Sequence, residues 1–190
     1  MRLLLVVAAL VAMATSAARA LPGQSAKAVC AWAKRSRDLR AVNCATGGSE
    51  GVNDYLFGYI RKPDVTIPGR LPNDNFLSFE AHPNGKGTIV TEIVRYHHLP
   101  DVPSMKFLRK GGEGLEIVRG LYGDAVANDF IKARFVKHAA TGDVYRGRRF
   151  LYITTTIRQN NIGADAAHAV TIDDGFILRP AGSSPSDVGY

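Results

Sequence analysis

The segment Pro83-Asn84-Gly85-Lys86-Gly87 constrains the fold most, because it separates two β-prone runs at 76–82 and 88–98. An Asn-Gly pair in such a place is the strongest short-range signal for a β-hairpin. If Asn84-Gly85 is a two-residue turn, Phe79 lies opposite Val90 and Leu77 opposite Glu92. One face of the hairpin then gathers apolar side chains around a single polar one; its members are Leu77, Phe79, Ala81, Val90, Val94, Tyr96 and Glu92.

Two further segments have helical patterns. Residues 25–42 are rich in Ala, Arg and Lys, and this composition favours a helix that ends before Gly47-Gly48. Residues 113–122 place Leu115, Val118 and Leu121 at helical spacing, although two glycines weaken the pattern. We therefore predict one helix near the N-terminus and a second one in the middle of the chain.

The remaining ordered segments resemble strands. β-Branched and aromatic residues favour strands at 55–60, 130–138 and 144–158, and the second of these would turn Ile131, Ala133 and Phe135 inward. A last hairpin is predicted around Asp173-Asp174-Gly175, with arms at 168–172 and 176–178.

These elements predict an α+β fold of one domain. The N-terminal helix and the second helix would pack on a curved, mostly antiparallel sheet of about six strands. Strand and helix do not alternate often enough for a parallel nucleotide-binding sheet. The roughly 170 residues after position 20 suffice for one core and are too few for two ordinary domains.

The N-terminus has the pattern of a cleaved secretory signal peptide. Arg2 precedes an uninterrupted apolar run at 3–13, and Ala18-Arg19-Ala20 places small residues where signal peptidase reads them. The apolar run is about half of what a membrane span needs. We therefore predict a signal peptide at 1–20, a secreted domain at 21–180 and a flexible tail at 181–190. The protein would be extracellular, or periplasmic in a bacterium.

Cys30 and Cys44 are the only cysteines of the chain. In an exported protein the default expectation is a disulfide between them. On one continuous helix, residues 14 positions apart would lie about 21 Å from each other along the axis, which is too far for a bridge. Either the helical segment breaks near 36–38 and folds back, or the two thiols remain free.

The charge of the chain is moderately positive. Removing residues 1–20 takes away Arg2 and Arg19 and no acidic residue, so the formal charge falls from +7 to +5. Such a balance predicts weak attraction to polyanions rather than a dedicated nucleic-acid protein. The arginine group Arg146, Arg148 and Arg149 is the candidate contact, and a solvated hairpin arm is its alternative interpretation.

Motifs for metals, cofactors and nucleophilic catalysis are weak. The five histidines show none of the spacings that bind metals, so no metal and no cofactor are predicted. Residues 47–51 match GxSxG, but a helix precedes the serine where a nucleophile elbow needs a strand. The glycines of 111–114 lack the ending of a phosphate-binding loop and instead indicate a flexible helix entry.

Two functions from different classes remain. The first is a secreted non-enzymatic binding module for a small ligand, a glycan or a protein, with Tyr96 and the three arginines as binding residues. The second is a small ribonuclease-like enzyme that cleaves phosphodiesters. In it, Glu92 would act as base, His97 as acid, and Arg149 would neutralise the charge that develops on phosphorus. No spacing links these three residues, so the second function depends on the fold bringing them together.

Overall fold

The computed structural model describes residues 21–44, 56–61, 75–105, 112–140, 142–160 and 170–184. The predicted signal peptide, the glycine-rich segment 47–51 and residues 185–190 of the predicted tail lie outside these ranges. The described residues form three helices: α1 (Ala26–Arg35), α2 (Glu113–Tyr122) and α3 (Asp124–Ile131). They also form eight strands: β1 (Arg40–Cys44), β2 (Leu56–Arg61), β3 (Phe76–Pro83), β4 (Ile89–His98), β5 (Arg134–Ala139), β6 (Gly142–Arg146), β7 (Phe150–Asn160) and β8 (Val170–Pro180).

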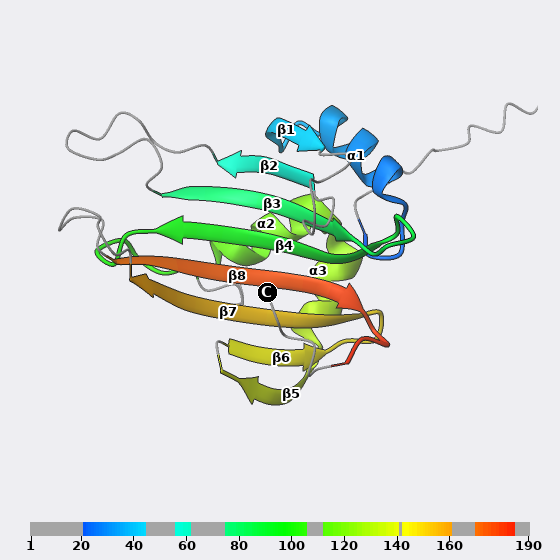
Figure 1. Cartoon of the computed structure of the whole chain (residues 1–190). Helices are drawn as coiled ribbons and strands as arrows, with labels where there is room; N and C mark the ends of the chain where they lie inside the picture. The colour runs from blue at the N-terminus through cyan, green and yellow to red at the C-terminus, as the bar shows by residue number, and fades with distance from the viewer. Residues whose placement is uncertain are drawn as a thin grey trace, which may run out of the picture.

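The strands form one open sheet in the order β1-β2-β3-β4-β8-β7-β6-β5, and every neighbouring pair is antiparallel. Helices α2 and α3 lie across one face of this sheet, behind it in the view of Figure 1. We call this the helix face and the opposite one the outer face. The prediction of an α+β fold with helices on an antiparallel sheet is confirmed, but the sheet has eight strands rather than about six.

The predicted hairpin is present as β3 and β4, with the expected face but a different register. Leu77 lies opposite Tyr96 and Phe79 opposite Val94, so the pairing is shifted by four residues from the two-residue-turn prediction. The turn is longer because the Asn84 carboxamide oxygen accepts the backbone N–H groups of Lys86 and Thr88, and a bulge follows at His82 and Pro83. A shift by an even number leaves each side chain on its face.

The first helix is shorter than predicted. Ser25 caps α1, since its hydroxyl accepts the Ala28 N–H, and the helix ends at Arg35. The chain then turns and returns as β1 along β2, because Leu39 is buried against the core. This return brings the Cα atoms of Cys30 and Cys44 to 6.1 Å, and the predicted disulfide between them is confirmed. A loop of this length stabilises the fold by about 3 kcal/mol.

The segment predicted as a strand at 130–138 begins instead as the end of α3. Val126, Ala127 and Phe130 lie on the buried side of this helix. Gly123, with a φ of +84°, separates α2 from α3. The inward orientation predicted for Ile131 and Phe135 is wrong, because both side chains are exposed. Strand β5 starts only at Arg134.

The hairpin predicted around Asp173-Asp174-Gly175 is also wrong. Strand β8 runs straight through these residues, between β4 and β7. Both aspartates are buried, and each finds hydrogen-bond partners outside its own strand. Contacts between distant segments therefore override the local turn signal.

The main hydrophobic core lies between the sheet and the helices. Phe79, Tyr152 and Phe176 are fully buried there beneath α2 and α3, and Trp32 of α1 packs edge-on against Phe79. A smaller apolar cluster on the outer face consists of Ile93, Val144, Leu151, Ile153 and Ile177. Among the described residues, no helix is long and apolar enough to cross a membrane.

Candidate functional site

A pocket of about 590 Å³ opens where the end of β4 meets the start of α2. Strand β4 contributes Tyr96, and the segment after it contributes a second wall. The first turn of α2 forms the third wall. The complete lining is Tyr96, Pro103, Ser104, Met105, Gly112, Glu113 and Gly114.

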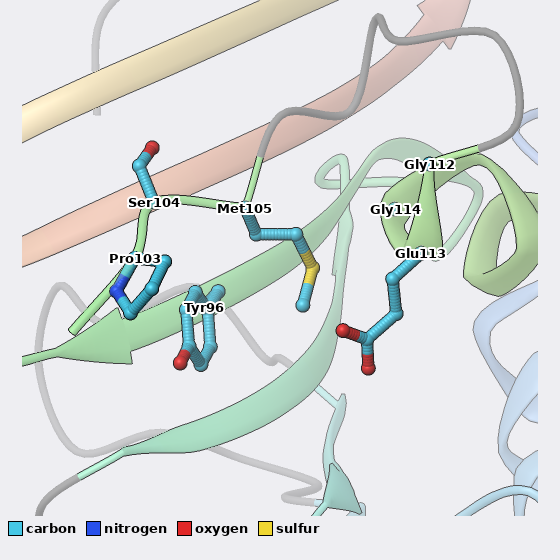
Figure 2. A pocket seen from close by; sticks show the side chains of 7 residues that line it. All are labelled: Tyr96, Pro103, Ser104, Met105, Gly112, Glu113 and Gly114. Carbon is cyan, nitrogen blue, oxygen red and sulfur yellow. The ribbon is translucent and has the colours of Figure 1, made fainter.

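Figure 2 shows how these side chains lie around the pocket. The Met105 thioether and the Glu113 carboxylate point toward one another across the space beside the Tyr96 ring. Gly112 and Gly114 leave the wall at the helix start free of side chains, at the site that the sequence indicated as a helix entry. The pocket thus combines an aromatic ring, a thioether and a proline ring with a hydroxyl and a carboxylate.

The Asp174 carboxylate fixes the wall that carries Ser104 and Met105. Its Oδ2 accepts the Ser104 hydroxyl at 2.7 Å and the Met105 backbone N–H at 2.9 Å. Its Oδ1 accepts the Thr156 hydroxyl of β7 at 2.8 Å. Burial acts to raise the Asp174 pKa. The hydrogen bonds from His98, Ser104 and Thr156 and the charge of His98 outweigh burial, so the pKa is lowered overall. Asp174 is therefore ionised and ties the pocket wall to the centre of the sheet.

His98 completes this hydrogen-bonded group as a buried cation. It donates from Nδ1 to the Leu99 carbonyl at 2.8 Å and from Nε2 to Asp174 Oδ2 at 3.1 Å. Because both partners are acceptors, both ring nitrogens carry a proton. Burial acts to lower the His98 pKa, but these hydrogen bonds and the charges of Asp174 and Asp173 outweigh it and raise the pKa. The Tyr96 ring stacks on His98 with 4.7 Å between ring centres, so the cation also supports the pocket.

Glu92 is buried on the helix face and takes no part in the pocket. Burial raises the pKa of Glu92 to about 8, although Tyr122 of α2 acts to lower it. No hydrogen bond of normal geometry reaches either carboxylate oxygen from the part of the chain that the structure describes. Glu92 is therefore mostly protonated at neutral pH. A neutral acid sealed beneath α2 cannot take a proton from a bound substrate.

The structure does not bring Glu92, His97 and Arg149 together. Neighbouring residues of a strand point to opposite faces, so His97 lies on the outer face while Glu92 lies on the helix face. Arg149 lies in the β6–β7 turn, where its guanidinium is 5.6 Å from the centre of the Phe150 ring.

The predicted binding residues also lie apart from one another. Tyr96 lines the pocket, whereas Arg146, Arg148 and Arg149 are exposed around the β6–β7 turn and none of them lines it. Asp129 holds this turn by accepting the backbone N–H groups of Arg148 and Arg149.

A second polar group lies on the outer face and was not predicted. Arg95 is at its centre, with Nε 3.2 Å from Glu80 Oε1 and Nη1 3.5 Å from Asp173 Oδ2. A histidine pairs with each carboxylate, since His82 Nε2 is 3.4 Å from Glu80 and His97 Nδ1 is 2.7 Å from Asp173. We call these five residues the outer-face row.

The sequence pattern indicates only part of the outer-face row. Glu80, His82, Arg95 and His97 alternate with the apolar positions of the predicted hairpin, which indicates that they share its other face. Asp173 and Asp174 could not be assigned, because the sequence places them in a turn. Ser104 and Met105 lie in an irregular segment without periodicity. Within the described ranges, no three His, Cys, Asp or Glu side chains are grouped to hold a metal ion.

The chain matches no family model, and neither a curated protein nor a solved structure matches it. Its function must therefore be inferred from these side chains alone.

Proposed function

We propose that this chain is a secreted, non-enzymatic binding module whose ligand occupies the pocket beside Tyr96. The observation that carries the proposal is the pocket itself. Its volume of about 590 Å³ falls within the range of small-molecule sites. Export is supported by the Cys30–Cys44 disulfide, since such bonds persist in oxidising compartments.

The lining indicates the chemical character of the ligand. Tyr96, Pro103 and Met105 suit an apolar or aromatic body, and Ser104 and Glu113 offer polar contacts at the rim. The Asp174 hydrogen bonds hold Ser104 and Met105 in place before a ligand arrives, which reduces the entropy lost on binding. A small amphipathic molecule meets these conditions better than a long polymer.

Filling the pocket should abolish binding without unfolding the protein. We expect Met105→Trp to weaken the affinity for the ligand that co-purifies with the secreted protein by about 100-fold, because the larger side chain occupies the space of the ligand. Native mass spectrometry of the secreted chain measures the occupancy. Ala125→Trp, at an exposed position of α3 outside the pocket, is the matched control. Equal occupancy in both variants, or repeatedly empty wild-type protein, would contradict the proposal.

The outer-face row supports a second candidate function, a phosphodiester-cleaving enzyme. Cleavage of RNA needs a base for the 2′-hydroxyl, an acid for the departing 5′-oxygen and a cation for the phosphoryl oxygens. His82 and His97, on either side of Arg95, supply these residue types without Glu92. Aromatic rings continue from His97 to Phe76 and Tyr59 and could stack on bases.

An assay on single-stranded RNA separates the two functions. The binding-module proposal predicts no cleavage above a mock preparation at mildly acidic or neutral pH. An enzyme built on the outer-face row would instead lose about 100-fold of its activity in His97→Gln, the scale of a lost acid or base. Glu92→Gln is the control, since Glu92 lies on the other face of the sheet. Cleavage that is lost only in the His97 variant would replace the binding module with the enzyme.

A further inference from the structure

Three large apolar side chains are exposed at one end of the sheet. They are Ile131 at the end of α3 and Phe135 and Val136 of β5, with exposed fractions of 39%, 45% and 38%. Within the described ranges, no other large apolar side chain is exposed. Strand β5 is an edge of the sheet (Figure 1), and Val136 is the extra residue of a bulge between Phe135 and Lys137.

Exposed basic residues flank the same edge, in β5 itself, at the end of α3 and in the β6–β7 turn. Arg134 of β5 lies directly opposite Arg146 of β6, and the Arg146 guanidinium donates to the Ala181 carbonyl. Two like charges in opposite positions cost stability unless a counter-charge is present. Asp129 is nearby, but its carboxylate is engaged by the Arg148 and Arg149 backbone and by the Tyr152 hydroxyl. The full basic set is Lys132, Arg134, Arg146, Arg148 and Arg149.

This combination distinguishes between partners. The bulge and the charged side chains of β5 oppose the addition of another strand to the edge. A nucleic acid or an acidic glycan would use the positive charges but would leave Ile131, Phe135 and Val136 unexplained. An anionic lipid bilayer offers phosphates for the basic residues and an apolar layer just beneath them.

We propose that the β5 edge docks on the surface of an anionic lipid bilayer. Ile131, Phe135 and Val136 enter between the headgroups while the five basic residues contact the phosphates. Three apolar side chains bury little area, so the binding is peripheral and depends on salt. The proposal is independent of the pocket, because none of these residues lines it.

Vesicle sedimentation with the full secreted chain tests this. We expect binding to vesicles of equal parts phosphatidylglycerol and phosphatidylcholine, little binding to phosphatidylcholine alone, and release by high salt. Arg134→Gln combined with Arg146→Gln should weaken binding by about 10-fold or more, given the contribution of each basic residue at such a surface. Lys34→Gln combined with Arg35→Gln removes the same charge from exposed positions of α1 and should change binding less than twofold.

The apolar part of the proposal needs its own variant. Val136→Ser should also weaken vesicle binding, while leaving binding to heparin unchanged. Phe135→Ser serves as a second variant, with its thermal melting compared to wild type because Phe135 contacts the Tyr145 ring. Absence of binding to anionic vesicles would overturn the proposal. Equal losses in the two charge variants, or full vesicle binding by both serine variants, would also overturn it, because general attraction to polyanions would then explain the binding.

Discussion

Replacing Asp174 with alanine should lower the free energy of unfolding by about 3–5 kcal/mol, the cost of breaking a buried ion pair by removing one partner. The His98 cation would remain buried without its counter-charge. The hydroxyls of Ser104 and Thr156 and the Met105 N–H would lose their acceptor at the same time. Urea denaturation near pH 6 measures the loss.

A surface aspartate provides the comparison for this variant. Asp124 pairs with Arg119 at 2.8 Å, but its side chain is 73% exposed. Asp124→Ala should therefore cost no more than about 1 kcal/mol. If the two alanine variants lose equal stability, Asp174 does not hold the pocket wall in the way described. The Asp174 variant should also lose the co-purifying ligand, because Ser104 and Met105 are released together.

Raising the pH from 5 to 9 should destabilise the folded protein by several kcal/mol, and Glu92 should account for most of the change. Burial raises the Glu92 pKa from 4.5 to about 8. The folded state then holds its proton more tightly than the unfolded state does. The stability linked to this proton is complete below pH 4.5 and is lost progressively as the pH rises to about 8.

His98 acts in the same direction. Its pKa is also raised in the folded state, so its contribution is complete below about pH 6.5 and is lost as the pH rises through the folded pKa. Asp174 has the opposite sign, since its lowered pKa gives stability that is lost only as the pH falls below about 3.8. The protein should therefore be most stable between about pH 4 and pH 6.

The variant Glu92→Gln isolates the carboxyl group. An amide cannot ionise, so the variant should match wild type near pH 5 and exceed it by about 4 kcal/mol at pH 9. Urea denaturation across this pH range gives the comparison. Glu116→Gln on α2 is the control, because its side chain is 62% exposed. A wild-type curve that is flat from pH 5 to pH 8, or an unchanged slope in Glu92→Gln, would refute the assignment.

Local patterns predicted the elements whose neighbours in space are also neighbours in sequence. Helix α2 has the predicted bounds because Leu115, Val118 and Leu121 line one side of it. The β3–β4 hairpin has the predicted face because an even register shift preserves it. Strand β1 was missed because its helix-forming composition is overridden by pairing with β2. Such pairing depends on a distant segment and leaves no periodic trace in the five residues of β1.

The candidate site shows the same division. Tyr96 could be selected as an aromatic residue on a predicted strand. The sequence pattern also placed Glu92 on the apolar face of the hairpin, but it could not indicate that α2 covers this residue. The resulting burial makes Glu92 a neutral core residue rather than a catalytic base. Asp174 was predicted to lie in a turn, because aspartate is typical of turns. In the structure it is instead the hydrogen-bond acceptor that joins β4, β7 and the pocket wall.

The place of β8 affects how the chain reaches its native state. Among the described strands it is the last in chain order, yet it lies in the middle of the sheet between β4 and β7. The two halves of the sheet cannot join until residues 170–180 are available, so many contacts close long loops, and this topology predicts slow folding. Until then β4 and β7 expose unpaired edges, which invite aggregation. If the chain is exported unfolded, as proposed, the same delay keeps it competent for export.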